Sequence, residues 1–156
     1  MVDELQNNQQ KLLKMLDASK TLALATLNAQ HEPEASLTPY IYYQQALWIF
    51  VSQLSAHTAN LMQHKKASVL INETESKNIF ATTRVTLQCH VEMEDGGDSV
   101  LDEMESQLGE TVAMLRQLPD FYLLKLQPVS GRFIAGFGQA YDIAFPELQL
   151  THIGIK

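Results

Sequence analysis

The sequence predicts a mainly β protein in which a mostly antiparallel barrel carries a few peripheral helices. Its 156 residues are 46% hydrophobic and 19% charged, a balance typical of one globular domain with a buried core. Six or seven short runs rich in branched and aromatic residues are separated by turn-forming residues, which is the pattern of β-strands. Three helical patterns lie at irregular positions between them, whereas a parallel sheet would need strands and helices in regular alternation.

Charge and cysteine content exclude several classes of protein. The net charge of −7 argues against binding to nucleic acid or to an anionic membrane through bulk charge, but it allows a local cationic pocket for an anion. Cys89 is the single cysteine, which rules out an internal disulfide and a cysteine-based zinc site. No stretch is long and apolar enough for a signal peptide or a membrane span, so a cytoplasmic location is expected.

The first part of the chain is expected to form a helix and two strands. Residues 1–18 place leucines on one side of a helical pattern, and this N-terminal helix should pack across the sheet. Residues 21–27 alternate small and large side chains and predict a strand. Residues 34–43 predict a second strand, which Pro39 interrupts, as expected at a sheet edge or a bulge.

The stretch from Ala46 to Leu61 predicts a buried strand that runs directly into a helix. Its apolar run is followed by Ser55, which occupies the position of a helix N-cap. A helix start presents unpaired backbone N–H groups and the positive end of the helix dipole, so an anion can bind there. The side chains that could add donors to such an anion are Ser55, His57, Thr58 and Asn60. The alternative is that Ser55 only caps the helix.

Residues 67–72 and 79–91 predict two further strands, and the second shows the clearest alternation in the chain. Its polar face consists of Thr82, Arg84, Thr86, Gln88 and His90. That face is either solvated or part of a groove or interface. In a groove, Arg84 is the best candidate for an anion contact, because its planar guanidinium pairs with phosphate or carboxylate.

The last part of the chain predicts one helical region, two more strands and a tail. Residues 98–118 have apolar side chains at helical spacing, and Gly109 is expected to divide them into two helices. Residues 121–126 and 132–137 predict two strands separated by a turn. Residues 144–156 show only weak periodicity and are expected to form a C-terminal tail of the same single domain, which spans residues 1–156.

Four motifs, in this order, resemble a known family. They are FVSQLSAHTANL (Phe50 to Leu61), RVTLQC (Arg84 to Cys89), LPDF (Leu118 to Phe121) and GRFIAGFGQAY (Gly131 to Tyr141). The resemblance is to the haem-utilisation branch, of the HugZ/HutZ type, of the pyridoxamine 5′-phosphate oxidase-like FMN-binding split barrels. It implies a Greek-key split barrel of six or seven antiparallel strands. It also implies a homodimer with cofactor sites at the subunit interface.

The resemblance also implies roles for individual residues. Flavin members of the superfamily hold the FMN phosphate at positions that match Ser55, His57 and Arg84. His57 replaces the usual lysine, and a neutral imidazole is a weaker phosphate partner than an ammonium, which favours the haem branch. In that branch, a histidine near the C-terminus binds the haem iron with the support of a carboxylate. By position these residues would be His152 and Asp120.

Three functions therefore remain in competition. The first is a haem-binding protein of haem utilisation that supports oxidative haem degradation and iron release, with electrons supplied by a partner. The second is an FMN-dependent oxidoreductase that holds the phosphate with Ser55, Thr58 and Arg84. The third is a binding module without turnover that stores or passes on haem or flavin. The sequence identifies no catalytic residue for any of them.

Overall fold

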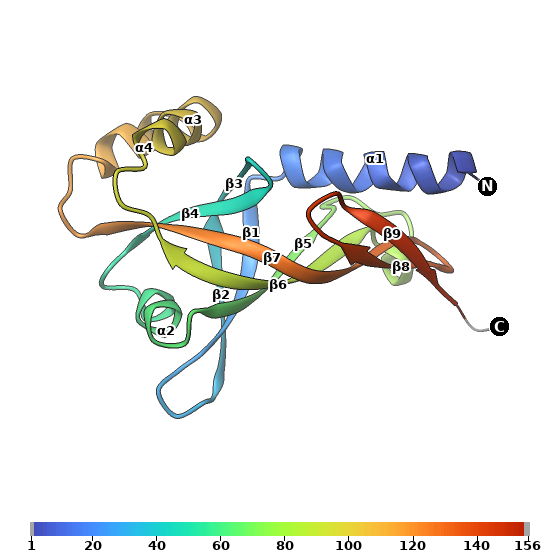
Figure 1. The fold of residues 1–156 in the computed structure, drawn as a ribbon, viewed down its shortest axis with the longest axis horizontal. Coiled ribbons are helices and arrows are strands. Elements are labelled where there is room, and N and C mark those ends of the chain that lie inside the picture. Colours follow the sequence, from blue (N-terminus) through green and yellow to red (C-terminus); the bar gives the residue numbers. More distant parts are fainter. Residues whose placement is uncertain (1, 155–156) are drawn as a thin grey trace.

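One long strand organises the fold. In the computed structural model, which describes residues 2–154, β7 (Phe121–Gly136) crosses the whole molecule (Figure 1). The other strands are β1 (Thr21–Leu27), β2 (Pro33–Pro39), β3 (Ile41–Tyr43), β4 (Ala46–Ser52), β5 (Lys66–Asn72), β6 (Arg84–Met93), β8 (Gln139–Ala144) and β9 (Gln149–Ile153). The helices are α1 (Val2–Ala18), α2 (Ala56–His64), the 3₁₀ helix η1 (Ile79–Ala81), α3 (Asp98–Leu108) and α4 (Glu110–Leu115).

The strands form one curled antiparallel sheet in the order β2-β1-β5-β6-β7-β4-β3. On one side, β7 pairs with β6. On the other side, its first part pairs with β4 and its last part with β8, which continues to β9. Each strand pairing is antiparallel, and helices lie at the periphery (Figure 1). The predicted fold class, a mainly β split barrel with peripheral helices, is confirmed.

Two apolar cores hold the sheet and helices together. The larger core fills the inside of the curled sheet and is closed by leucines of α1, including Leu12 and Leu16. The smaller core lies between β3, β4 and β7 and the helices α3 and α4, and it contains Trp48 and Met104. The two helices are separated at Gly109, which has a positive φ of 98°, so the predicted division of this region is confirmed.

Several details differ from the sequence-based expectations. The sheet has nine strands within the described residues instead of six or seven, because Pro39 ends β2 before β3 and because β8 and β9 also form. The expected tail at residues 144–156 contains β9, although Ile155 and Lys156 lie outside the described residues. The strand expected over residues 79–91 starts only at Arg84, because residues 79–81 form η1.

The largest difference concerns β7, which is continuous where a turn was expected at residues 128–131. Pro128 cannot donate a backbone hydrogen bond, but it lies at a register shift where β6 moves from Gln88 to Cys89. The strand pairing is already irregular at this bulge, so the missing N–H of Pro128 does not interrupt the strand. Gly131 then pairs with Leu87, where β6 and β7 approach each other closely.

Replacing Gly131 with alanine is expected to lower the free energy of unfolding by about 1–3 kcal/mol. The added Cβ would lie 2.8 Å from Leu87 Cδ2 and 2.9 Å from the Thr86 carbonyl oxygen, and the latter belongs to paired backbone. Gly136→Ala is the matched control in the same strand, because its nearest contact is Gln139 Oε1 at 3.9 Å. Urea denaturation should separate the two variants, and equal stabilities would contradict the close approach of β6 and β7.

Candidate functional site

Helix α2 is attached to the β1–β2 hairpin by polar side chains. His57 Nδ1 is hydrogen-bonded to Ser36 Oγ of β2 at 2.9 Å. Asn60 Nδ2 donates to Thr26 Oγ1 of β1 at 3.0 Å and to Glu34 Oε1 of β2 at 2.6 Å. The donors expected to face an anion therefore hold the helix against the sheet within one subunit.

At the start of α2, the Thr58 side chain is also engaged in a hydrogen bond within the described part of the subunit, whereas that of Ser55 is not. Thr58 is buried, and its hydroxyl donates to the Ser52 carbonyl oxygen at 2.6 Å. Ser55 occupies the N-cap position, as predicted, but its side chain makes no capping hydrogen bond. Burial lowers the pKa of His57, which favours the neutral imidazole and so brings no positive charge to this helix start. Among the candidates on α2 and its cap, only the Ser55 hydroxyl has no internal hydrogen bond in the structure.

Arg84 lies at the other end of the sheet and shares a pocket with a second arginine. Its Nη1 donates to the Thr82 carbonyl oxygen at 2.8 Å, and its side chain lines an open pocket of about 400 Å³. Thr86 of β6 pairs with Arg132 of β7, so Arg132 is diagonal to Arg84 and lines the same pocket. Within the described residues, Arg132 also forms an exposed ion pair with Asp142 at 3.6 Å. The sequence motif contained Arg132, but only the register shows that it lies beside Arg84.

His152 lies on β9, and three neighbours fix its exposed ring. Nε2 donates to the Gly138 carbonyl oxygen at 3.2 Å, and the ring packs edge-on against Tyr141 with a centroid distance of 5.4 Å. Gly154 lies against the other edge, where an added Cβ would be 2.8 Å from Cε1 and 3.1 Å from Nδ1. A metal-ligating histidine typically donates one N–H to a carbonyl or carboxylate and keeps its other nitrogen for the metal. His152 has this arrangement.

Asp120 does not lie near His152 in the same subunit. Its backbone carbonyl accepts from Gln53 N at 2.8 Å, which places it beside the connection from β4 to α2, at the start of β7. His152 pairs with Tyr141, which pairs with Phe133 near the end of β7. The two positions are separated along β7 by about 40 Å at roughly 3.3 Å per residue. The start of β7 and strand β9 are correspondingly far apart in the fold (Figure 1).

The predicted site residues therefore fall into two groups. The α2 group contains Ser55, His57, Thr58, Asn60 and Asp120. The β9 group contains Arg84 and His152, which both lie near the end of β7 but on opposite faces of the sheet, because His152 is in register with Tyr141 and Phe133 whereas Arg84 is in register with Ile134. No set of three or more His, Cys, Asp and Glu side chains in the described part of the chain could hold a metal ion directly. Within residues 2–154, no helix is long and apolar enough to cross a membrane.

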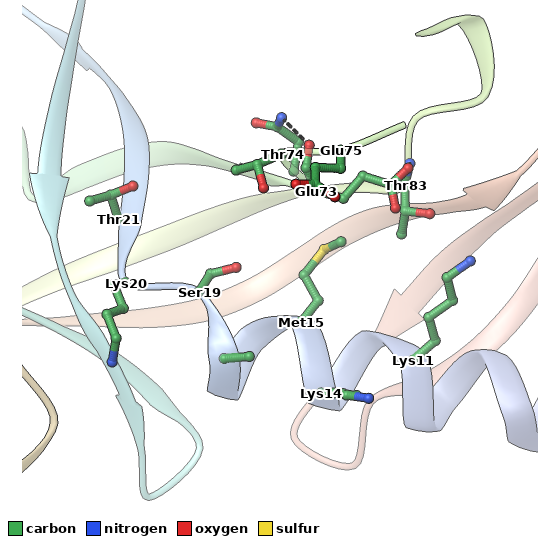
Figure 2. A pocket seen from close by; sticks show the side chains of 12 residues that line it. Lys11, Lys14, Met15, Ser19, Lys20, Thr21, Glu73, Thr74, Glu75 and Thr83 are labelled. Atoms are coloured by element: carbon green, nitrogen blue, oxygen red, sulfur yellow. Dashed lines mark hydrogen bonds between the residues drawn. The ribbon is translucent and has the colours of Figure 1, made fainter. Parts of the chain in front are cut away.

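A larger open pocket lies between α1 and the connection from β5 to η1. Its polar side chains do not converge on a common position where a ligand could bind. The pocket has a volume of about 730 Å³, and its lining includes Lys11, Lys14 and Lys20. Figure 2 shows that these side chains point in different directions. Lys11 Nζ donates to the Ala135 carbonyl oxygen at 2.7 Å, and Lys20 Nζ donates to the Gln107 carbonyl oxygen at 3.1 Å. We assign no ligand to this pocket.

Comparison with known proteins agrees with this fold. The pyridoxamine 5′-phosphate oxidase family matches residues 9–135. The haem oxygenase HutZ of Vibrio cholerae is 36% identical over 135 residues, which are 83% of this chain and 77% of HutZ. Both the extent of the family match and this identity show membership of the family.

Solved structures give the same result. ChuZ of Campylobacter jejuni superimposes with a TM-score of 0.85 at 31% identity, over 96% of this chain and 63% of ChuZ. The structure of HutZ, described as the haem storage protein of Vibrio cholerae, has a TM-score of 0.71 at 31% identity, over 76% of this chain and 88% of HutZ. The chain belongs to the pyridoxamine 5′-phosphate oxidase family and, within it, to the HutZ-type branch that its motifs indicated.

Proposed function

We propose that the protein binds haem at a site built from two copies of the chain and serves haem utilisation. The observation that carries the proposal is the arrangement of His152, whose exposed ring donates from Nε2 to the Gly138 carbonyl and keeps Nδ1, which lies beside Gly154, for a metal. The names of the relatives support it, since one is a haem oxygenase and another is described as a haem storage protein.

The residues of the β9 group suit the chemistry of haem. Haem supplies an iron that takes an axial imidazole, a flat apolar ring and two propionates. His152 would hold the iron. Arg84 and Arg132 face the opposite side of the sheet, so their shared pocket is a separate anion site that would fit a carboxylate such as a propionate. Arg84 donates one N–H to Thr82, so most of its five donors stay available.

A second copy of the chain is needed to complete this site. Asp120 is the proposed supporting carboxylate, and it lies too far from His152 in the same subunit to contact it. We therefore propose a homodimer in which His152 of one subunit meets Asp120 of the other. In such a dimer the carboxylate would replace the Gly138 carbonyl as the acceptor of the Nε2–H, and it would orient the imidazole and raise its basicity.

An exposed apolar face is available for the second copy. Ala23 and Ala25 of β1 are paired across the strand with Leu37 and Ala35 of β2, and with Leu70 on the other side of Ala23. Leu37 is 67% exposed and Leu70 is 39% exposed. Contiguous apolar groups on a sheet surface commonly mark an interface. The small side chains would also let a flat ring approach the sheet.

Oxidative breakdown of the bound haem would need electrons from outside the chain. We propose that a separate electron-donor protein supplies them, that the chain holds and orients the haem, and that iron is released with the product. A binding module without turnover would hold haem equally well, and it differs only in leaving the haem intact when a reductant and oxygen are present.

FMN is the alternative cofactor. The family match and the free hydroxyl of Ser55 favour it. The hydrogen bonds of His57, Thr58 and Asn60 weigh against it, because these side chains are engaged within the subunit and the imidazole is neutral.

An absorbance titration of the purified protein with haem, and separately with FMN, distinguishes the two cofactors. We expect a saturable Soret change at one haem per subunit and no saturable flavin binding. Tight FMN binding with only unsaturable haem uptake would contradict the proposal. If haem binds, adding ascorbate under oxygen tests turnover, because a haem-degrading protein loses the Soret band and a storage protein keeps it.

A further inference from the structure

A small apolar pocket lies between the barrel and the helices α3 and α4. It has a volume of about 360 Å³. Its apolar walls are Met104 and Leu108 of α3, Val112 and Leu115 of α4, and Phe50 and Pro39 of the sheet. Phe50 pairs with Leu123 at the start of β7, so the pocket is at the opposite end of this strand from His152 of the same subunit. None of its residues belongs to the α2 or β9 group.

One charged side chain lines this pocket in the described part of the chain. Lys20 Nζ donates to the Gln107 carbonyl oxygen at 3.1 Å, which ties the last turn of α3 to the barrel. An ammonium has three donors, so two remain for a ligand. The hydroxyls of Thr21 and Thr111 also line the pocket, and both residues are exposed, as is Lys20. The polar groups are thus at the solvent side, and the apolar groups are inside.

We propose that this pocket binds a small monocarboxylate with an apolar body. The carboxylate would pair with Lys20, and the body would contact the apolar side chains of α3, α4 and Phe50. The volume is near the lower end of the range of roughly 300–1,000 Å³ for small-molecule sites, so the ligand is small. The same small volume makes haem, which has a large flat macrocycle, a poor candidate.

The single tryptophan is positioned to report such binding. Trp48 precedes Phe50 by two residues on β4, so the two side chains point to the same face of the sheet. Trp48 is also in the smaller core with Met104 and Val112, which both line the pocket. A ligand there should change the fluorescence of Trp48. It should also stabilise the docking of the two helices and raise the melting temperature.

The test uses monomeric decanoate as the probe and decanol as its uncharged counterpart. In the wild-type chain, we expect saturable decanoate binding at one site per subunit, measured by Trp48 fluorescence and by calorimetry. Lys20→Met should weaken decanoate binding by about fivefold and leave decanol binding unchanged. Lys14→Met is the matched control, because Lys14 is an exposed lysine outside this pocket, and its affinity for decanoate should equal that of the wild type.

A substitution that fills part of the pocket tests the location of the binding site independently of charge. Leu115 is half-buried, so Leu115→Phe should fill part of the pocket, keep the fold and weaken both probes. The proposal is overturned if decanoate does not saturate the wild-type chain, or if Lys20→Met binds it as tightly as the wild type. It is also overturned if decanoate displaces haem, since the ligand would then occupy the haem site. Because the probe and the variants differ from those for haem, the failure of one proposal leaves the other standing.

Discussion

Replacing His152 with alanine is expected to weaken haem binding by roughly 100-fold or more and to shift the Soret band. Loss of a group that merely supports a metal ligand typically costs 10–100-fold in affinity, so loss of the ligand itself should reach the upper end. His152 is exposed, and its substitution should change the free energy of unfolding by less than about 0.5 kcal/mol. Absorbance titration measures the affinity, and urea denaturation checks the fold.

Two further variants make this result specific. His90→Ala removes another exposed imidazole, on β6, and should leave haem binding unchanged. Gly154→Ala keeps His152 but places a Cβ within 2.8 Å of Cε1 and 3.1 Å of Nδ1, so it should shift the ring and weaken binding by an intermediate amount. Added imidazole should restore a wild-type-like Soret band in His152→Ala. An unchanged band without imidazole would mean that His152 does not bind the iron.

Local sequence patterns were sufficient to predict a strand or helix where one face of that element is buried. In β6, Val85, Leu87 and Cys89 are buried, whereas Thr86 and Gln88 are exposed, which is the alternation that predicted the strand. Burial raises the pKa of the Cys89 thiol to about 12, as expected for a core cysteine without a chemical role. The junction from β4 to α2 was predictable for the same reason, since an apolar run and an N-cap residue are both local signals.

Local patterns failed where strand formation depends on distant partners. Pro128 indicated a turn, but the register shift in β6 lets β7 continue past it, and nothing near Pro128 in the sequence records that shift. The tail showed weak periodicity, but β9 forms by pairing with β8. A strand at a sheet edge obtains its hydrogen bonds from its neighbour, so its own sequence can carry little of the signal.

Local sequence patterns were also insufficient to predict how the residues of the candidate site are grouped. The residue types for an anion or haem site were visible in the sequence, but their grouping was not. Ser36, the partner of His57, is distant in the sequence, and only the folded sheet brings the two together. Likewise, the pairing of Thr86 with Arg132 places a second guanidinium beside Arg84. The separation of Asp120 from His152 follows from the length of β7, which the expected turn had hidden.

The separation of these two residues leads to a complementation experiment. Asp120→Asn is expected to weaken haem binding by about tenfold, because an amide supports the imidazole less well than a carboxylate does. His152→Ala alone is expected to weaken haem binding more than Asp120→Asn does. A homodimer of either single variant would have two defective sites.

A heterodimer of the two variants should regain one intact site. In a two-fold symmetric dimer, the wild-type His152 of the Asp120→Asn subunit faces the wild-type Asp120 of the His152→Ala subunit, and both defects fall together in the other site. The two variants can be co-expressed with different affinity tags and purified through both. We expect one haem per heterodimer at wild-type affinity. If both residues served a site within one subunit, no site of the heterodimer would be intact, and the absence of any wild-type-affinity haem would reject the shared site.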